Sequence, residues 1–234
     1  MIEEEAFDDD DEEDSIVQSL KDVFSELDHQ LSPQYAMDGG CTGSVVVRWG
    51  LHLYIANAGD SRSFVATYDT ETQEIKIPYI TREDKPNLPD EKARIEQANG
   101  NVFIPPPPKN PSLSRVIVYS TTKKENVGLA MSRSIGDWEW GAVGVTAEPI
   151  VDKVDIQDLA KPTVQLFVVS ASDGLFDARR PEFIATHLAE SFYGTTSNSI
   201  HPLVACENIF RLATLEDPTW YRDDITLSAI KVVT

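Results

Sequence analysis

The sequence predicts an α+β protein with antiparallel sheets. Short apolar runs separated by turn residues fill most of the chain, and helical patterns gather toward its C-terminal end. There is no strand–helix–strand alternation and no internal repeat, which argues against a parallel sheet or a solenoid. We expect one domain over residues 15–234, preceded by a solvated, disordered acidic tail at residues 1–14.

The composition is that of a globular protein, with 41% hydrophobic and 9% aromatic residues. The net charge of −19 includes ten acids within residues 1–14, and there is no basic stripe, so nucleic acid is not an expected partner. We expect no membrane span, because no run of 18 apolar residues occurs. The N-terminus lacks the pattern of a secretory signal. Cys41 and Cys206 are expected to be free buried thiols in a reducing, intracellular compartment, cytoplasmic or nuclear.

The first half of the chain predicts one long helix and a series of strand pairs. Ser15 is a suitable N-cap for the helix, whose apolar residues recur at helical spacing up to Leu31 before Pro33 ends it. Gly50 indicates a hairpin turn. The expected strands are 44–49 with 51–56, then 63–68 with 74–79, and a short helix at 87–95 leads to a strand at 101–104.

The second half begins with four consecutive prolines at residues 105–108. We interpret them as the start of a stiff, exposed loop that continues to about residue 124; an SH3-type ligand is the less favoured alternative. The Gly- and Trp-rich stretch at 136–144 is expected to be a loop. Further strands are expected at 127–132, 150–156, 164–170 and 224–232, and helices at 181–191 and 202–216.

Carboxylates recur where apolar strands begin or end. The strand over residues 164–170 reads as buried on both faces, and Gly174 allows a tight turn that holds Asp173 at its end. The same pattern of an acid beside an apolar strand gives a set of four: Asp60, Asp173, Asp177 and Asp223. Any one of them could serve only as a turn residue. Together, with little Lys or His nearby in sequence, they favour a site for a hard cation such as Mg²⁺ or Mn²⁺.

Other kinds of catalytic site lack their residues. No Gly-x-Ser-x-Gly elbow occurs, and neither cysteine has an arginine at the spacing of a cysteine phosphatase. The glycine-rich stretch at 40–44 is not a phosphate-binding loop of the Walker type. The four histidines are scattered and do not show zinc-ligand spacing.

Seven segments, from Gly40–Gly43 to Asp223–Thr226, resemble motifs of the type 2C (PPM) metal-dependent protein serine/threonine phosphatases. The similarity covers about residues 15–234, and its motifs occur in the family's order. They are Gly40–Gly43, Leu53–Arg62, Thr81–Pro86 with Glu91 and Arg94, Leu129–Asp137, Glu148-Pro149, Ser172–Asp177 and Asp223–Thr226.

The resemblance implies an α-β-β-α sandwich of two antiparallel sheets flanked by helices, with a site for two Mg²⁺ or Mn²⁺ ions and, in some members, a third. Asp173 and Asp223 match metal ligands of the family, and Asp60 and Asp177 match residues that help to hold the third ion. The implied activity is hydrolysis of phosphoserine and phosphothreonine in phosphoproteins by a metal-activated water. A loop containing Trp138 and Trp140 matches the family's flap and is expected to influence substrate choice.

The chain departs from the family at its N-terminal end, where no Glu-Asp pair and no Asp-Gly-His-Gly-Gly motif precede Ser15. Asp38-Gly39-Gly40 lies after the first helix and is not that motif, and Asp224 stands where the family has Asn. Three interpretations remain open: part of an ordinary phosphatase, a pseudophosphatase that binds partners, or an interaction domain that uses the polyproline loop. Retention of all four aspartates favours the first. The sequence does not indicate an oligomeric state.

Overall fold

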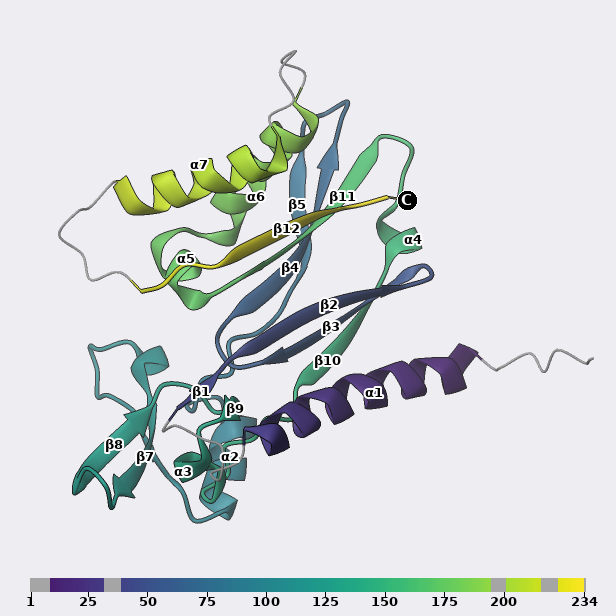
Figure 1. Cartoon of the computed structure of the whole chain (residues 1–234). Coiled ribbons are helices and arrows are strands. Elements are labelled where there is room, and N and C mark those ends of the chain that lie inside the picture. The colour runs from purple at the N-terminus through teal and green to yellow at the C-terminus, as the bar shows by residue number, and fades with distance from the viewer. Residues whose placement is uncertain (1–8, 32–38, 195–200, 216–222, 234) are drawn as a thin grey trace, which may run out of the picture. The chain divides into compact units, whose positions relative to one another are not determined.

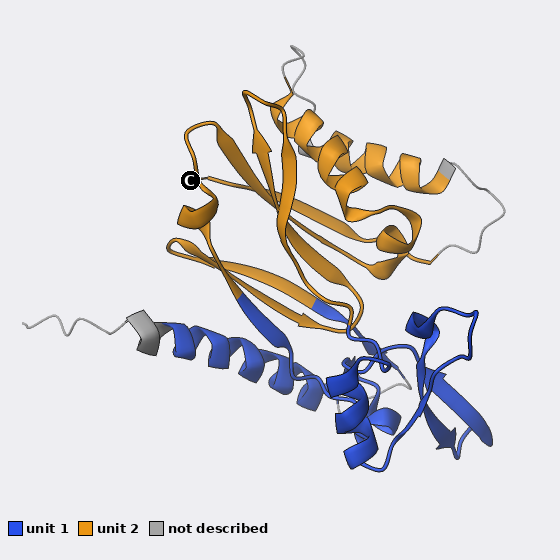
Figure 2. Ribbon diagram, turned by 180° about the vertical axis from the view of Figure 1, so that it is seen from behind, with its two compact units in different colours: residues 1–43, 84–152 blue, residues 44–83, 153–234 orange. Residues whose placement is uncertain are grey.

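The computed structural model describes residues 9–31, 39–194, 201–215 and 223–233. The chain forms two compact units, one from residues 1–43 and 84–152 and the other from residues 44–83 and 153–234 (Figure 2). The prediction of one domain over residues 15–234 remains a prediction, because compact units of one chain need not be separate domains. The chain passes from one unit to the other at three places, and two of them fall inside strands: residues 43/44 in β2 (Gly43–Trp49) and residues 152/153 in β10 (Ile150–Asp155). No linker therefore marks the division.

The second unit is organised around β11 (Val164–Ala171), the central strand of an antiparallel sheet with the order β12-β11-β4-β5 (Figure 1). Its neighbours are β4 (Arg62–Asp69) and β12 (Leu227–Val232), and β5 (Ile75–Ile80) lies at the edge beyond β4. A second sheet has the order β10-β3-β2, with β3 covering His52–Ala58. Gly50, at φ +56°, makes the predicted hairpin turn between β2 and β3.

Alternate side chains of β11 face two different layers, as the buried apolar run predicts. Phe167 and Val169 belong to a core shared with helices α6 (Pro181–Tyr193) and α7 (Pro202–Leu215). Leu166 and Val168 belong to a core shared with residues of β3. The unit therefore stacks helices, a four-stranded sheet and a three-stranded sheet, which confirms the α+β prediction with antiparallel sheets.

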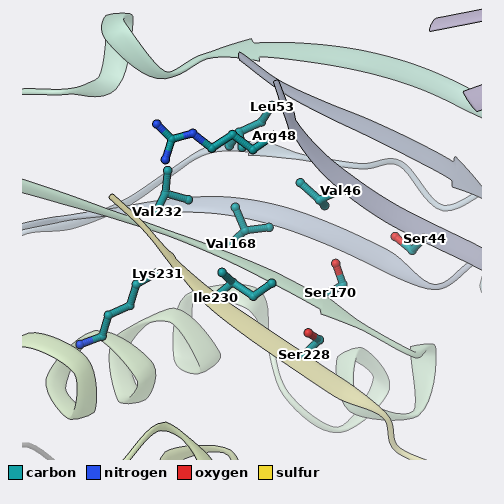
Figure 3. Close-up of a pocket in the computed structure, with 10 residues that line it drawn as sticks. All are labelled: Ser44, Val46, Arg48, Leu53, Val168, Ser170, Ser228, Ile230, Lys231 and Val232. Atoms are coloured by element: carbon teal, nitrogen blue, oxygen red, sulfur yellow. The ribbon is translucent and has the colours of Figure 1, made fainter. Parts of the chain in front are cut away.

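A cavity of about 260 Å³ lies between these two sheets, where edge strands β2 and β12 face each other (Figure 3). Apolar side chains line most of it, with Arg48 toward one end and serines toward the other. The Ser63 hydroxyl lies 2.7 Å from that of Ser44 and 2.6 Å from that of Ser170, so a chain of hydroxyls joins the two sheets beside the cavity.

The first unit contains a long helix, α1 (Asp9–Gln30), and a small three-stranded sheet. Strands β6 (Asn101–Phe103), β7 (Arg115–Ser120) and β8 (Glu125–Leu129) form this sheet in the order β6-β7-β8. Helix α2 (Pro89–Gln97) and a short helix, α3 (Trp138–Gly141), accompany it, and Ile95, Val116 and Val145 form its core. The remaining short elements are β1 (Gly40–Cys41), β9 (Ile135–Gly136), η1 (Pro111–Leu113), α4 (Ile156–Leu159) and α5 (Asp173–Ala178).

Several predicted boundaries need correction. Helix α1 begins at Asp9, so the last six residues of the predicted acidic tail are helical, where acids at a helix N-terminus are favourable. The predicted loop at 105–124 contains strand β7, and the loop at 136–144 contains α3. Cys41 and Cys206 are free as expected, but Cys41 is exposed and Cys206 only partly buried. Pro33 and Asp38 lie outside the described residues.

None of the helices in the described part of the chain is both long enough and apolar enough to cross a membrane.

Candidate metal centre

Strand register brings Asp60 and Asp173 to the same end of the four-stranded sheet. Arg62 pairs with Ala171 at the end of the antiparallel β4–β11 ladder. Asp60 lies two residues before Arg62, and Asp173 two residues after Ala171, so both carboxylates extend beyond the same end of the ladder. Asp60 follows Gly59, which has φ +113°, and is only 3% exposed. The two glycine-aspartate corners noted in the sequence are therefore one structural feature.

Ser172 joins this corner to the segment that carries Asp223. Its hydroxyl donates to the carbonyl of Asp224 (2.9 Å) and accepts from the amide of Thr226 (2.9 Å). Its amide donates to the Thr226 carbonyl (3.1 Å). Three hydrogen bonds on one residue thus fix the position of the 223–226 segment beside the start of α5.

Gly174 allows the same two segments to approach closely. A Cβ at this position would lie 2.6 Å from the Asp224 carbonyl oxygen and 3.2 Å from the Cβ of Asp223. Any side chain would therefore push the Asp223 backbone away from α5. Gly174 is therefore required for close approach of the two segments, in addition to its predicted role in a turn.

The other three predicted aspartates act on Asp173. Burial raises the pKa of Asp173 above its usual range, and the carboxylates of Asp60, Asp223 and Asp177 raise it further. The Gly174 amide, a hydrogen-bond donor, opposes them. Asp177 stands one helical turn after Asp173 on α5, at the i, i+4 spacing of side chains that share a helix face.

The chemistry of this donor set fits a hard divalent cation. Mg²⁺ takes carboxylate oxygens and keeps several waters, so a site needs only one or two carboxylates from the protein. A cation would also remove the repulsion that raises the pKa of Asp173. Among the described residues, no three His, Cys, Asp or Glu side chains converge into a complete metal cage.

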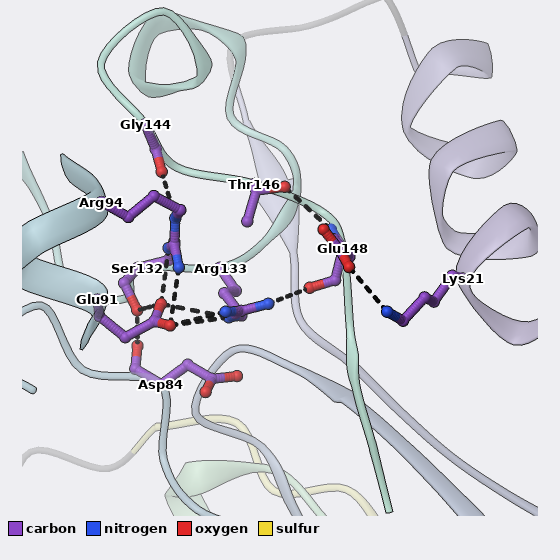
Figure 4. Close-up of polar contacts among 9 residues, drawn as sticks. All are labelled: Lys21, Asp84, Glu91, Arg94, Ser132, Arg133, Gly144, Thr146 and Glu148. Carbon is purple, nitrogen blue, oxygen red and sulfur yellow. Dashed lines mark hydrogen bonds and ion pairs between the residues drawn. The ribbon is translucent and has the colours of Figure 1, made fainter. Parts of the chain in front are cut away.

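The first unit holds a buried carboxylate in a different environment (Figure 4). Glu91 on α2 is fully buried and accepts hydrogen bonds from Arg94 (2.6 and 2.8 Å), Arg133 (2.8 Å) and the Ser132 hydroxyl (2.5 Å). Burial opposes its ionisation, but these donors outweigh burial and lower its pKa to about 2. Glu91 is therefore an ionised structural anchor that ties α2 to the 132–133 segment.

The predicted flap tryptophans lie in this unit, on α3, and differ in their contacts. Trp140 packs against the core around Val116 and donates from Nε1 to the Val116 carbonyl (2.9 Å). The Trp138 ring meets His29 edge-on at 6.4 Å, and its Nε1 has no hydrogen-bond acceptor in the described part of the chain. Trp140 is thus an anchor of the α3 segment, and Trp138 remains a predicted substrate residue.

A two-sheet α+β unit with aspartates gathered at one end of its central sheet is what we expect of a metal-dependent phosphatase. Comparison with known proteins gives the family. A family model described as protein phosphatase 2C matches residues 2–216, and the chain belongs to this family.

Similar proteins agree with this assignment. The chain is 34% identical over 163 residues to probable protein phosphatase 2C 41 of Arabidopsis thaliana, covering 68% of this chain and 44% of that protein. It is 29% identical over 204 residues to probable protein phosphatase 2C 1 of the same plant, covering 86% and 41%. The crystal structure of serine-threonine phosphatase 2C from Toxoplasma gondii shares its fold, with a TM-score of 0.72 at 20% identity, covering 92% of this chain and 67% of that one. The chain thus spans less than half the length of these plant relatives.

Proposed function

We propose that this chain carries part of the catalytic centre of a metal-dependent protein serine/threonine phosphatase that hydrolyses phosphoserine and phosphothreonine. The observation that supports this most directly is the gathering of Asp60, Asp173, Asp177 and Asp223 at one end of the β4-β11-β12 sheet. Family membership supports the reaction class.

Asp173 and Asp223 would hold Mg²⁺ or Mn²⁺ in a site for two ions, and Asp60 and Asp177 would contribute to a third. Bound divalent ions supply an activated water and neutralise charge on the phosphoryl oxygens. Ser172 keeps the Asp223 segment beside Asp173 through its three hydrogen bonds. Asp60, which follows Gly59 and is buried, places a carboxylate next to Asp173.

The substrate class is a phosphoprotein, and the Trp138 loop would influence which phosphoprotein is accepted. Two free cysteines support a reducing intracellular compartment, either the cytoplasm or the nucleus. Because the chain spans 44% of its plant relative, ligands outside this chain would complete the metal site. If none exist, the chain is a pseudophosphatase.

The test combines metal binding with turnover. Free Mn²⁺ is followed by electron paramagnetic resonance, and hydrolysis of a phosphothreonine peptide is measured in the same samples. We expect Mn²⁺ binding that Asp173→Asn weakens about tenfold or more, while the exposed-site control Asp158→Asn leaves it unchanged. Equal Mn²⁺ binding by Asp173→Asn and the unmutated protein would refute the site. Binding without hydrolysis would place catalysis only in a longer protein that supplies the missing ligands.

A further inference from the structure

The charge of the chain reverses in one segment. All 39 acidic residues lie outside residues 98–124, and this segment holds four basic residues: Lys109, Arg115, Lys123 and Lys124. Within the described ranges, none of these four forms an ion pair with a carboxylate. In a protein of net charge −19, this segment is a cationic stretch, although Glu125 follows it directly and Glu139 reaches its end, where it accepts a hydrogen bond from Ser120 (3.0 Å).

The segment forms most of the sheet β6-β7-β8, and helices α2 and α3 pack against one face of that sheet. Val116 of β7 points into the core with α2 and α3, which accompany β6 and β7 on that side (Figure 1). Alternation along β7 therefore directs Arg115, Ile117 and Tyr119 to the opposite face. Phe103 pairs with Arg115 across the β6–β7 ladder and shares this side. We call this surface the outer face.

The outer face combines apolar and basic groups. Phe103 is 50% exposed and Tyr119 63% exposed. Between them, Ile117 and Arg115 lie over Gly128 of β8, since a Cβ on this glycine would be 3.0 Å from Ile117 Cδ1 and 3.2 Å from Arg115 Cβ. Lys123 and Lys124 lie in the β7–β8 turn, and Lys109 in the loop that leads to β7. The lysines thus lie in the two connections at opposite ends of a short sheet.

We propose that the outer face binds an acidic segment of the phosphoprotein substrate, away from the phosphorylated residue. The proposal rests on the function proposed above. An acidic substrate is repelled by a protein of net charge −19, and a cationic face is where such a substrate can approach and be oriented. Phe103 and Tyr119 supply apolar contact area, which surface lysines alone would not provide.

The four prolines are not needed for this proposal, and their local geometry argues against the alternative of an extended proline ligand. The Lys109 amide donates to the Pro106 carbonyl (3.2 Å), so the chain turns within the proline run. A polyproline II ligand requires an extended backbone without internal hydrogen bonds. The basic outer face, and not the proline run, is therefore the expected contact.

The experiment measures binding without catalysis, so that it does not depend on phosphatase activity. A fluorescein-labelled, unphosphorylated peptide of alternating Glu and Ser with one central Leu is titrated with the protein, and its fluorescence anisotropy is followed at low and at high salt. We expect binding that weakens with salt, and a dissociation constant raised about tenfold by Lys123→Glu with Lys124→Glu. Tyr119→Ala is expected to weaken binding about fivefold. The matched control, Lys76→Glu with Lys161→Glu, makes the same change in charge at exposed positions of the other unit and is expected to change little.

Equal losses in the Lys123/Lys124 variant and the control variant would show only non-specific attraction and would overturn the proposal. Sedimentation gives a second outcome that would overturn the proposal: the protein self-associates, and the Lys123/Lys124 variant does not. The outer face would then bind the acidic N-terminal segment of a second copy. Failure of the proposed function has a different signature: acidic peptide binds the outer face, but no phosphopeptide is hydrolysed by any protein that contains this chain. If hydrolysis occurs, removal of the acidic residues from a phosphopeptide should raise KM and leave kcat unchanged.

Discussion

Replacing Glu91 with glutamine tests how the first unit is held together. The carboxylate is fully buried and accepts charged hydrogen bonds from Arg94 and Arg133, so its ionised form is stabilised by the fold. Its pKa is about 2, against an ordinary value of 4.5. At 1.36 kcal/mol per pKa unit, that difference corresponds to about 3 kcal/mol of stability. Glutamine keeps the shape but removes the charge, and leaves two arginines without their anion.

The contribution of Glu91 to stability depends on pH, and its direction follows from the lowered pKa. The pKa of Glu91 is lowered by folding, so its contribution is fully present above about pH 4.5 and is lost as the pH falls toward 2. The free energy of unfolding, measured by urea denaturation followed by tryptophan fluorescence, should therefore be about 3 kcal/mol lower for Glu91→Gln at pH 7. The difference between the two proteins should shrink steadily below pH 4.5.

A suitable control is Glu96→Gln on the same helix, because Glu96 pairs with Lys92 at the exposed surface. Its expected cost is at most about 0.5 kcal/mol, with little dependence on pH. If Glu91→Gln cost less than about 1 kcal/mol, or cost the same at pH 3 as at pH 7, the assignment of Glu91 as an ionised anchor would be refuted.

Two further changes are expected to separate metal binding from folding, and a third tests Trp140 as an anchor. Asp173→Asn should leave the melting temperature of the metal-free protein unchanged or slightly higher, because it removes repulsion between carboxylates. In the unmutated protein, Mn²⁺ at a hundred times its dissociation constant should raise the melting temperature by about 5–10 °C, and Asp173→Asn should abolish this increase. A retained increase would contradict the site. Gly174→Ala should weaken Mn²⁺ binding about tenfold in calorimetry, because its Cβ would displace the Asp223 segment, whereas exposed Gly141→Ala, which meets no atom within 4 Å, should not. Trp140→Phe should lower the free energy of unfolding by about 1–2 kcal/mol through loss of the Val116 hydrogen bond; a smaller loss would argue against its role as an anchor.

The strands and their pairing could be predicted where the sequence pattern is local. The Gly50 hairpin and the pairing of β4 with β5 are confirmed, because short-range turn chemistry and alternation determine them. The apolar run of β11 was correctly interpreted as buried on both faces. The start of α1 was wrong, because Ser15 is a good N-cap but the acids before it also suit the first turns of a helix.

The division into two units could not be predicted, since the chain crosses between them within strands rather than at linkers. The role of Glu91 was also missed. It stands in a matched motif, and Arg94 at i+3 was a usable signal, but Arg133 and Ser132 are 42 and 41 residues away in sequence. Only the fold brings these donors to one carboxylate. The same holds for Ser172, whose partners lie more than fifty residues later.

Glu91 and Asp173 show how a fold distinguishes a structural acid from one that needs a ligand. Burial acts on both, and it disfavours the charged form in both. At Glu91 the neighbouring groups are arginines and a hydroxyl, so the fold itself supplies the compensating charge and the pKa falls. At Asp173 the neighbouring groups are three carboxylates, so their repulsion adds to the effect of burial and the pKa rises. A protein that gathers carboxylates in this way is destabilised at neutral pH unless a cation binds. The sign of the shift, rather than its size, therefore separates Glu91, whose charge the fold compensates, from Asp173, which we propose as a metal ligand.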